Sequence, residues 1–520
     1  MNGVKKTVKT AGFMVVATLL AKFLGMYRDV LFAALYGTSE SAIAYQTASR
    51  IPLLFFDIAL GSAISSSFIP VFNEYLGKGE NEKAKEFSNS FLNIIFLITS
   101  VICMIGIIFR ASIVNLLASG LADDVKMLSS QLVAIMFPSM IFTALAYSLT
   151  GVLQSYGEFN APAAISLASN GIMVVYLLIA KDSLGIHGVS VAMLVAWTFQ
   201  LIILFPSLIK KKYSYSLKIN LKNEGLKKAL LLAIPILISS WVQPINTMVN
   251  MFLASFLNGG QAVSALEYAN KLYIIFVGVI TYAVSNLIFP SISRLAAEKD
   301  KKQEFTDVLK TAIGSVLFIL LPIMIVFLLK RVEIVRFVYE RGAFGSEQTA
   351  LTSCALLWYS FGMLGYGLQE MLNKAFYAEQ NGKTPMRVSV VGITLNIALS
   401  FVFVRVLHIG IAGLPLAASI ASVFMATVLS VILSKKYKVF DKSFLINLFK
   451  MAISAVVMAI FTVLSSKIGF SNGLLGRFLA VVIPGGIGLF GYVIVSFLLK
   501  TKETSMIIDI LRKRSEESAE

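Results

Sequence analysis

Residues 88–110 read SNSFLNIIFLITSVICMIGIIFR, an apolar stretch that ends at Arg110. About 20 apolar residues cross the hydrocarbon of a bilayer as a helix. Comparable stretches recur along all 520 residues, and the composition is 57% hydrophobic with only 14% charged residues. A soluble domain carries about a quarter charged residues. The sequence therefore predicts one polytopic all-α membrane domain and excludes a chain of water-soluble domains.

The same length criterion predicts fourteen membrane helices. We expect them near residues 10–36, 43–73, 88–110, 128–151, 160–180, 185–208, 228–256, 264–292, 309–330, 349–374, 385–405, 410–434, 446–466 and 476–500. An even number of spans places both termini on the same side of the membrane. Residues 331–339, between two of these helices, have the spacing of a short amphipathic helix on the periplasmic surface.

The short loops decide the orientation, because cytoplasmic loops carry an excess of Lys and Arg. Of the 45 Lys and Arg residues, thirty fall on the side of the N-terminus, the 210–228 loop and the C-terminal tail, and ten on the other. We therefore expect both termini in the cytoplasm. Topology explains most of the net charge of +17, so no nucleic-acid partner is expected. Cys103 and Cys354 both lie in apolar stretches, which argues against a disulfide framework or a cysteine metal site.

The two halves of the chain resemble each other at three places with nearly constant offset. Ala63-Ile-Ser65 with Pro70 matches Ala283-Val-Ser285 with Pro290, Ala42-x-x-Tyr45 matches Ala265-x-x-Tyr268, and Gly185-Ile-x-Gly188 matches Gly410-Ile-x-Gly413. Six expected helices separate the partners, so the repeats run parallel, as in transporters that rock two halves around a midplane site. We expect an N-lobe over 1–212, a C-lobe over 213–440, two additional helices over 441–500 and a charged cytoplasmic tail over 501–520.

Several expected helices carry charged side chains. They are Lys22, Arg28 and Asp29 in the first helix, Arg50 and Asp57 in the second, Glu267 and Lys271 in the eighth, and Glu370 in the tenth. A charge at the bilayer centre costs at least about 2.5–3.5 kcal/mol and so usually faces a cavity or a partner. Lys22, Arg28, Arg50 and Lys271 would make a cationic site between the halves, suited to an anion such as a diphosphate.

Most of these residues also have a structural explanation, although Lys22 lies in the middle of its helix and is harder to explain by extension to the interface. Arg50 and Lys271 lie near helix starts and could extend to the interface. Arg28 and Asp29 could form a structural ion pair, but neighbours on a helix do not face each other, so pairing of Asp29 across helices is favoured. Asp57, Glu267 and Glu370 would neutralise the cations or couple an ion. Asn246 and Asn250 would line the cavity or bond between helices.

Eight stretches together resemble the MurJ (MviN) lipid II flippase family of the multidrug/oligosaccharidyl-lipid/polysaccharide superfamily. They are Leu24-Gly-Met-Tyr-Arg28-Asp29-Val, Arg50-Ile-Pro52, Phe68-Ile-Pro-Val-Phe-Asn-Glu74-Tyr75, Gly151-Val-Leu-Gln-Ser-Tyr-Gly157, Tyr268-Ala-Asn-Lys271-Leu, Phe289-Pro-Ser-Ile-Ser-Arg294-Leu, Tyr339-Glu-Arg-Gly342-Ala-Phe344 and Phe376-Tyr-Ala-Glu-Gln-Asn-Gly-Lys383-Thr-Pro385. They run from the first to the eleventh expected helix in the family's order.

The resemblance implies export of undecaprenyl-diphosphate-linked peptidoglycan precursor to the periplasmic leaflet of the bacterial cytoplasmic (inner) membrane, with no catalytic residues or cofactor. It implies that Lys22, Arg28 and Lys271 line a cationic cavity, that helices 13 and 14 form a groove for the polyprenyl tail, and that the cell-wall synthesis machinery is a candidate partner. This chain departs from the family pattern at Phe56 and Asp57, where an arginine pair is common, and at Lys22 and Lys271, where arginine is usual.

Alternative functions stay open at this stage. The less basic cavity also suits a flippase for another polyprenyl-linked saccharide, such as an O-antigen or exopolysaccharide unit. A multidrug–cation antiporter fits less well, since a cation exporter needs acids in its cavity. A polyprenyl-phosphate transferase would need clustered carboxylates or histidines near one membrane face, which the sequence does not display. No clear match to a sodium-binding carboxylate set is found, so coupling to membrane potential, H⁺ or Na⁺ is undecided.

Overall fold

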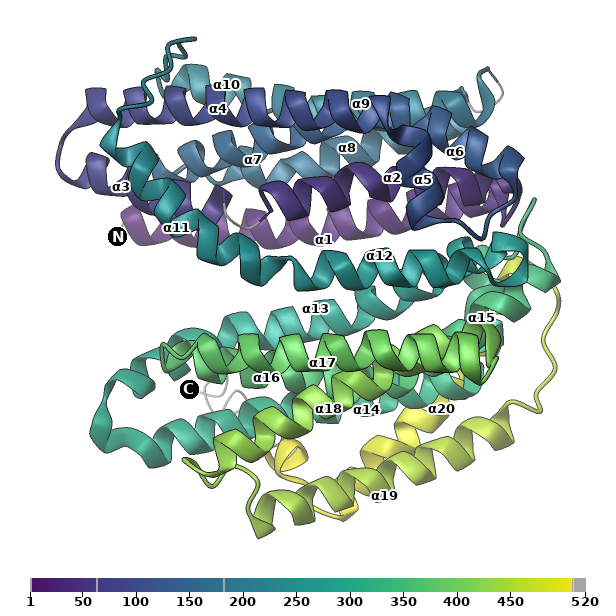
Figure 1. The fold of residues 1–520 in the computed structure, drawn as a ribbon. Coiled ribbons are helices and arrows are strands. Elements are labelled where there is room, and N and C mark those ends of the chain that lie inside the picture. Colours follow the sequence, from purple (N-terminus) through teal and green to yellow (C-terminus); the bar gives the residue numbers. More distant parts are fainter. Residues whose placement is uncertain (1, 62–63, 181–182, 507, 509–520) are drawn as a thin grey trace. The chain divides into compact units, whose positions relative to one another are not determined.

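The structure, a computed structural model, describes residues 2–61, 64–180, 183–506 and 508 (Figure 1). Every regular element in these ranges is a helix, which confirms the predicted all-α class. The chain forms two compact units. Unit 1 comprises residues 1–264 with 341–344, and unit 2 comprises residues 265–340 and 345–520. Ala63, Lys181 and most of the predicted 501–520 tail lie outside the described residues.

Unit 1 contains the first twelve α-helices, one π-helix and one 3₁₀ turn. They are α1 (Asn2–Tyr36), α2 (Glu40–Ala59), the π-helix η1 (Ile64–Phe68), α3 (Ile69–Gly77), α4 (Asn81–Ile108), α5 (Arg110–Leu117), α6 (Asp123–Met136), α7 (Ser139–Ser155), α8 (Asn160–Ile179), α9 (Gly185–Ile202), α10 (Phe205–Lys210), α11 (Glu224–Ser240), α12 (Val242–Ser255) and the 3₁₀ turn η2 (Asn258–Gly260).

Unit 2 contains the remaining helices, apart from the first residues of α13. They are α13 (Gln261–Ala297), η3 (Lys299–Lys301), α14 (Lys302–Tyr339), α15 (Ser346–Phe361), α16 (Met363–Ala378), α17 (Lys383–Phe401), the π-helix η4 (Val402–Val406), η5 (Gly410–Ala412), α18 (Gly413–Ser434), α19 (Lys442–Ser465) and α20 (Leu474–Leu498). Residues 331–339, predicted as a separate amphipathic helix, form the end of α14 beyond a kink at Lys330 (φ −113°, ψ 20°).

Ten helical segments among the described residues are long and apolar enough to cross a membrane. They lie at 81–108, 123–155, 160–179, 185–210, 258–285, 302–339, 383–406, 410–434, 442–465 and 474–498. The other four expected spans are also helical, as α1, as α2 with α3, as α11 with α12, and as α15 with α16. The chain is thus an all-helical membrane protein.

The predicted repeat is visible in how helices pack within each unit. In unit 1, α4 packs on α7, α7 and α6 pack on α9, and α8 packs on α9. In unit 2, α14 packs on α16, α16 and α15 pack on α18, and α17 packs on α18. These are the same pairings shifted by six expected spans. The fourth expected span of each repeat is also broken, after Met136 in unit 1 and after Phe361 in unit 2.

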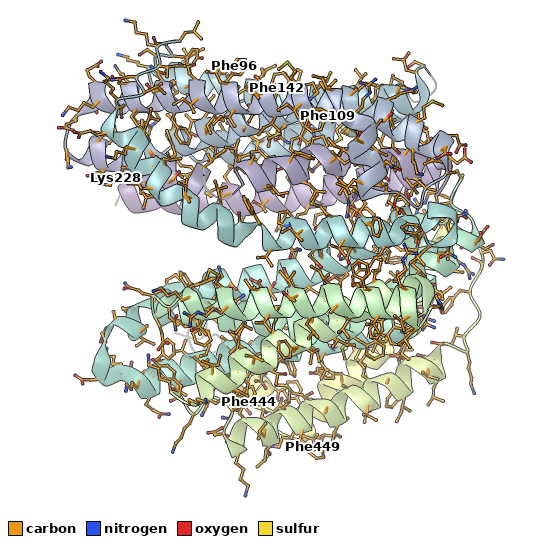
Figure 2. The ribbon with its side chains drawn as sticks, viewed as in Figure 1. Phe96, Phe109, Phe142, Lys228, Phe444 and Phe449 are labelled. Carbon is orange, nitrogen blue, oxygen red and sulfur yellow. The ribbon has the colours of Figure 1, made fainter. Side chains whose placement is uncertain are left out.

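Aromatic rings fill the place in unit 1 where the second expected span ends. Phe68 stacks on Phe72 and on Phe87, both with ring centroids 5.3 Å apart. Gly151 lets the Phe68 ring pack closely against α7, since a Cβ at this position would lie 3.1 Å from the ring. Apolar rings also face outward: Phe96 on α4 and Phe449 on α19 point away from their neighbouring helices (Figure 2) and are 46% and 67% exposed, as expected for lipid contact.

Ion pairs join helix ends within each unit. Glu74 on α3 accepts hydrogen bonds from Lys78, at 2.8 Å, and from Lys228 at the start of α11. The ammonium group of Lys228, followed by that of Lys78, lowers the pKa of the Glu74 carboxyl to about 2. In unit 2, Lys310 on α14 donates to Asp441 at 2.8 Å, and this bond lowers the pKa of Asp441. These pairs tie α3 to α11 and α14 to the start of α19.

Candidate substrate-binding residues

Arg28 and Asp29 form an ion pair on α1. Arg28 donates from Nε and Nη2 to Asp29 Oδ1, at 3.0 and 2.8 Å. This is the structural ion pair that the sequence left open, formed although adjacent helix positions do not face each other. The Arg28 side chain is 31% exposed and that of Asp29 only 10%. The carboxylate therefore holds the guanidinium at a partly accessible position.

A second helix holds the same guanidinium. Nη1 of Arg28 donates to Oδ1 of Asn170 on α8 at 2.9 Å, and Asn170 Nδ2 donates to the Ala21 carbonyl at 3.1 Å. Gly25 makes this approach possible, since a Cβ at this position would lie 3.2 Å from Asn170 Nδ2. The sequence reasoning missed Asn170. The available signal was a single amide inside an apolar span, which in membranes commonly bonds between helices.

Lys22 lies six residues before Arg28 on α1 and is half-buried. Among the described residues, neither Lys22 nor Asp57 has an ion-pair partner within 4 Å. Asp57 is exposed near the end of α2, whereas Arg50 is half-buried in the middle of the same helix. The rings of Phe32 and Tyr45, 4.8 Å apart, connect α1 to α2. Unit 1 thus carries three of the four predicted cations on two connected helices.

Helix α2 ends two residues after Asp57. It ends at Ala59, and Gly61 follows with φ +27°. Trp241, between α11 and α12, donates from its indole Nε1 to the Ile58 carbonyl at 2.7 Å. Sequence reasoning gave Trp241 no role, although a helix break leaves carbonyls that need donors. The contact positions α12, on which Asn246 is buried and Asn250 is half-buried.

Unit 2 contains the other predicted charged residues. On α13, Lys271 and Glu267 form an i, i+4 ion pair with Nζ and Oε1 3.5 Å apart. Their side chains are 25% and 13% exposed, so the pair is largely shielded from solvent. Glu370 is half-buried on α16, one turn before Lys374, whose Nζ lies 5.5 Å from the centre of the Phe289 ring. The acid at position 267 is therefore placed to neutralise Lys271.

Comparison with known proteins gives a consistent result. The family model described as "Lipid II flippase MurJ" matches residues 32–483. A probable lipid II flippase MurJ from Rhizobium tropici is 29% identical over 99% of this chain and 97% of its own length. A probable lipid II flippase MurJ from Buchnera aphidicola subsp. Schizaphis graminum is 30% identical over 88% of this chain and 89% of its own length.

Solved structures agree. A lipid II flippase MurJ in an inward closed conformation aligns with a TM-score of 0.80 and 27% identity, over 93% of this chain and 98% of that one. An inward-facing multidrug resistance MATE family transporter of the MOP superfamily aligns with a TM-score of 0.66 and 15% identity, over 81% of this chain and 99% of that one, and at this identity shares the fold alone. The chain belongs to the lipid II flippase MurJ family, whose members are membrane transporters and not enzymes.

Proposed function

We propose that this chain flips lipid II, the undecaprenyl-diphosphate-linked peptidoglycan precursor, from the cytoplasmic to the periplasmic leaflet of the bacterial inner membrane. The observation that carries the proposal is the family match over residues 32–483, supported by relatives that align over nearly the whole chain. In this role the chain supplies precursor for cell-wall synthesis, and the enzymes of that process are candidate partners.

Arg28 is the residue best suited to bind the diphosphate. A guanidinium has five N–H groups in a fixed planar fork. Three of them donate to Asp29 and Asn170 in the described structure, so two are left for phosphate oxygens. The side chain is pre-oriented by two helices and stays partly exposed, which lowers the entropy lost on binding. Bidentate binding of phosphate by arginine is among the stronger charge-assisted contacts.

Lys22, Arg50 and Lys271 would complete a cationic central cavity with Arg28. Asp29, Asp57 and Glu267 would keep these cations from repelling one another when no substrate is bound, and Asn246 and Asn250 would add polar contacts. The pairs that support this division of roles are Arg28 with Asp29 and Lys271 with Glu267. Transport would be driven by the membrane potential, H⁺ or Na⁺.

The transport cycle would be alternating access by two lobes. We propose fourteen spans with both termini in the cytoplasm, an N-lobe over 1–212, a C-lobe over 213–440 and a tail over 501–520. Helices within 441–500 would form a groove for the polyprenyl tail. The repeated helix pairings within the two units support a pair of related lobes, and such repeats rock around a midplane site in other transporters.

A flippase for another polyprenyl-linked saccharide is the second candidate function. It is favoured by one observation: Phe56 and Asp57 stand where an arginine pair is common in the resembled family, so the cavity would be less basic. Both functions require diphosphate recognition and differ in the saccharide that is carried.

The decisive experiment is rescue of a bacterial strain depleted of its lipid II flippase. Expression of this chain should restore growth and the exposure of lipid II on the outer leaflet, measured by surface cleavage or labelling of the precursor. Arg28→Ala should abolish both at normal expression, whereas Lys126→Ala, which removes a cation paired with Asp123 on α6, should rescue fully. Good expression without precursor exposure would favour the saccharide alternative, and normal flipping by Arg28→Ala would eliminate the proposed role of Arg28.

A further inference from the structure

Unit 2 has a small polar cavity where α14 meets the connection between α19 and α20. Its volume is about 150 Å³, which leaves room for several water-sized groups. The lining comes from three parts of the chain: α14 at and beyond the Lys330 kink, residues 466–472 of the connection, and the first turns of α20. The three helices pack on one another, as the lower part of Figure 1 shows for unit 2.

Three cations line this cavity, two from α14 and one from α20. Lys330, Arg336 and Arg477 face it together with one acid, Glu333. The Lys330 side chain is only 5% exposed, and its Nζ donates to Glu333 Oε1 at 2.6 Å and to Ser466 Oγ at 3.2 Å. The kink at Lys330 allows this, because α14 changes direction there and directs the ammonium group towards the α19–α20 connection.

The two arginines are held by a carboxylate at the back of the site. Arg336 Nε and Arg477 Nη2 each lie 3.3 Å from a different oxygen of Glu340. Arg477 also donates to the Glu340 carbonyl at 2.5 Å and to the Asn472 carbonyl at 3.1 Å. Glu340 therefore contacts both guanidinium groups, and each guanidinium retains N–H groups that these contacts do not use. Since a carboxylate held between two arginines is neutralised, the cavity keeps an excess of positive charge.

The surroundings of the cavity indicate what kind of anion it suits. Ser466, Ser471 and Asn472 add hydrogen-bonding groups, while Ile468 and Phe470 make part of the wall apolar. Leu474 and Leu475 begin α20 beside it and are 61% and 70% exposed, which marks a lipid-facing helix. A ligand here would thus place an anionic group among cations and an apolar part against an exposed hydrophobic surface. Basic pockets between membrane helices bind lipid head groups by this combination.

We propose that this cavity binds the phosphate group of an anionic membrane lipid. The phosphate oxygens accept hydrogen bonds from Lys330, Arg336 and Arg477, and the hydrocarbon chains lie along the first turns of α20. Two lipids carry this chemistry: an anionic phospholipid such as phosphatidylglycerol, and a polyprenyl diphosphate. The residues of this cavity belong to unit 2, whereas Arg28 belongs to unit 1, and the proposal does not depend on the proposed transport function.

Binding to the purified full-length chain can be measured by native mass spectrometry with four probes. Phosphatidylglycerol and undecaprenyl diphosphate should bind, whereas phosphatidylcholine and inorganic phosphate should bind at least about tenfold more weakly, the difference expected for one lost charge-assisted contact. Tighter binding of one of the two anionic lipids identifies the source of the phosphate group.

Variants separate this site from other basic surfaces. Lys330→Gln and Arg336→Gln should each weaken phosphatidylglycerol binding by about tenfold. Arg336 is the safer substitution, because its side chain is 43% exposed and its loss leaves the Lys330 pair intact. Lys126→Gln, which removes the same charge from another helical ion pair, should change binding less than about twofold, a difference below 0.5 kcal/mol. Arg28→Ala should leave phosphatidylglycerol binding unchanged even if it abolishes flipping.

Three outcomes would overturn the proposal. The first is unchanged phosphatidylglycerol affinity in the Arg336→Gln variant. The second is equal binding of phosphatidylcholine, since the cations would then play no part. The third is binding of inorganic phosphate without binding of either anionic lipid, which would make the cavity a site for a soluble anion.

Discussion

Asn170 on α8 accepts a hydrogen bond from Arg28 on α1 over 2.9 Å and donates one to the Ala21 carbonyl on the same helix. The Asn170 amide therefore joins two turns of α1 by hydrogen bonds. Gly25 lies between those turns, and its lack of a side chain leaves the space that the amide occupies. The proposed diphosphate-binding residue is positioned by a side chain that no charge pattern reveals.

Asn170→Ala should slow lipid flipping by about tenfold without lowering expression. The substitution removes the oxygen that accepts from Arg28 and the N–H that donates to the Ala21 carbonyl. Leaving a buried polar group without its hydrogen-bond partner costs about 1–3 kcal/mol. The measurement is precursor exposure in the depleted strain. Ser169→Ala is a matched control, because Ser169 bonds to Gln200 of α9 and not to Arg28. Equal flipping by both variants would show that Asn170 does not position Arg28.

Gly342→Ala should lower the melting temperature of the purified chain more than Gly79→Ala does. Gly342 has φ +57°, and a Cβ there would lie 2.2 Å from the Ala34 carbonyl oxygen on α1. The next residue, Ala343, donates its backbone N–H to that carbonyl at 2.8 Å, so the clash also breaks a hydrogen bond.

The matched control for this variant is Gly79→Ala. Gly79 has φ +74° with nothing within 4 Å of a Cβ, so it isolates the backbone strain of about 1–2 kcal/mol. Similar melting temperatures for the two variants would mean that the loop around Gly342 moves away without cost.

Asp441 stabilises the start of α19 in two ways that substitution can separate. Its carboxylate caps the helix by accepting from the Phe444 N–H at 2.9 Å, and it pairs with Lys310. Asp441→Asn keeps the cap and loses the ion pair, whereas Asp441→Ala loses both. We expect Asp441→Ala to be less stable than Asp441→Asn by about 1 kcal/mol, the value of a cap. Thermal unfolding of the three proteins checks this, and equal loss in both variants would assign the whole effect to Lys310.

Glu74 makes stability depend on acid pH. Its folded-state pKa is lowered to about 2 by Lys228 and Lys78, below the ordinary value of 4.5, so the ionised form is favoured by folding. The stabilisation is therefore fully present above pH 4.5 and is lost as the pH falls towards 2. Glu74→Gln should melt at a lower temperature than the parent chain at pH 6, and the difference should shrink steadily on acidification.

Lys228→Gln tests whether the partner is correctly identified. Figure 2 places Lys228 near the start of α11, and its bond to Glu74 is the first cause of the lowered pKa. This variant should lose most of the same pH-dependent difference. A parent-like acid profile for Lys228→Gln would contradict the ion pair between α3 and α11.

The sequence by itself determined the class of the protein, the positions of most helices and the family. Long apolar stretches have one stable form in lipid, because every backbone N–H and C=O group must be satisfied within the segment. The charged residues of the candidate site were likewise found from the sequence, since a charge inside an apolar stretch is costly and therefore conspicuous.

Tertiary structure decided which partner each of these residues has. Arg28 could pair with Asp29, with Asn170 or with both. The choice depends on the rotation of α1 against α8 and on the space left because Gly25 has no Cβ. The cavity around Lys330 likewise combines distant segments of the chain. The hydrogen bond between Lys330 and Ser466 links residues 136 positions apart in the sequence. Apolar periodicity carries no information about such contacts, because close packing between helices depends on the shapes of both surfaces together.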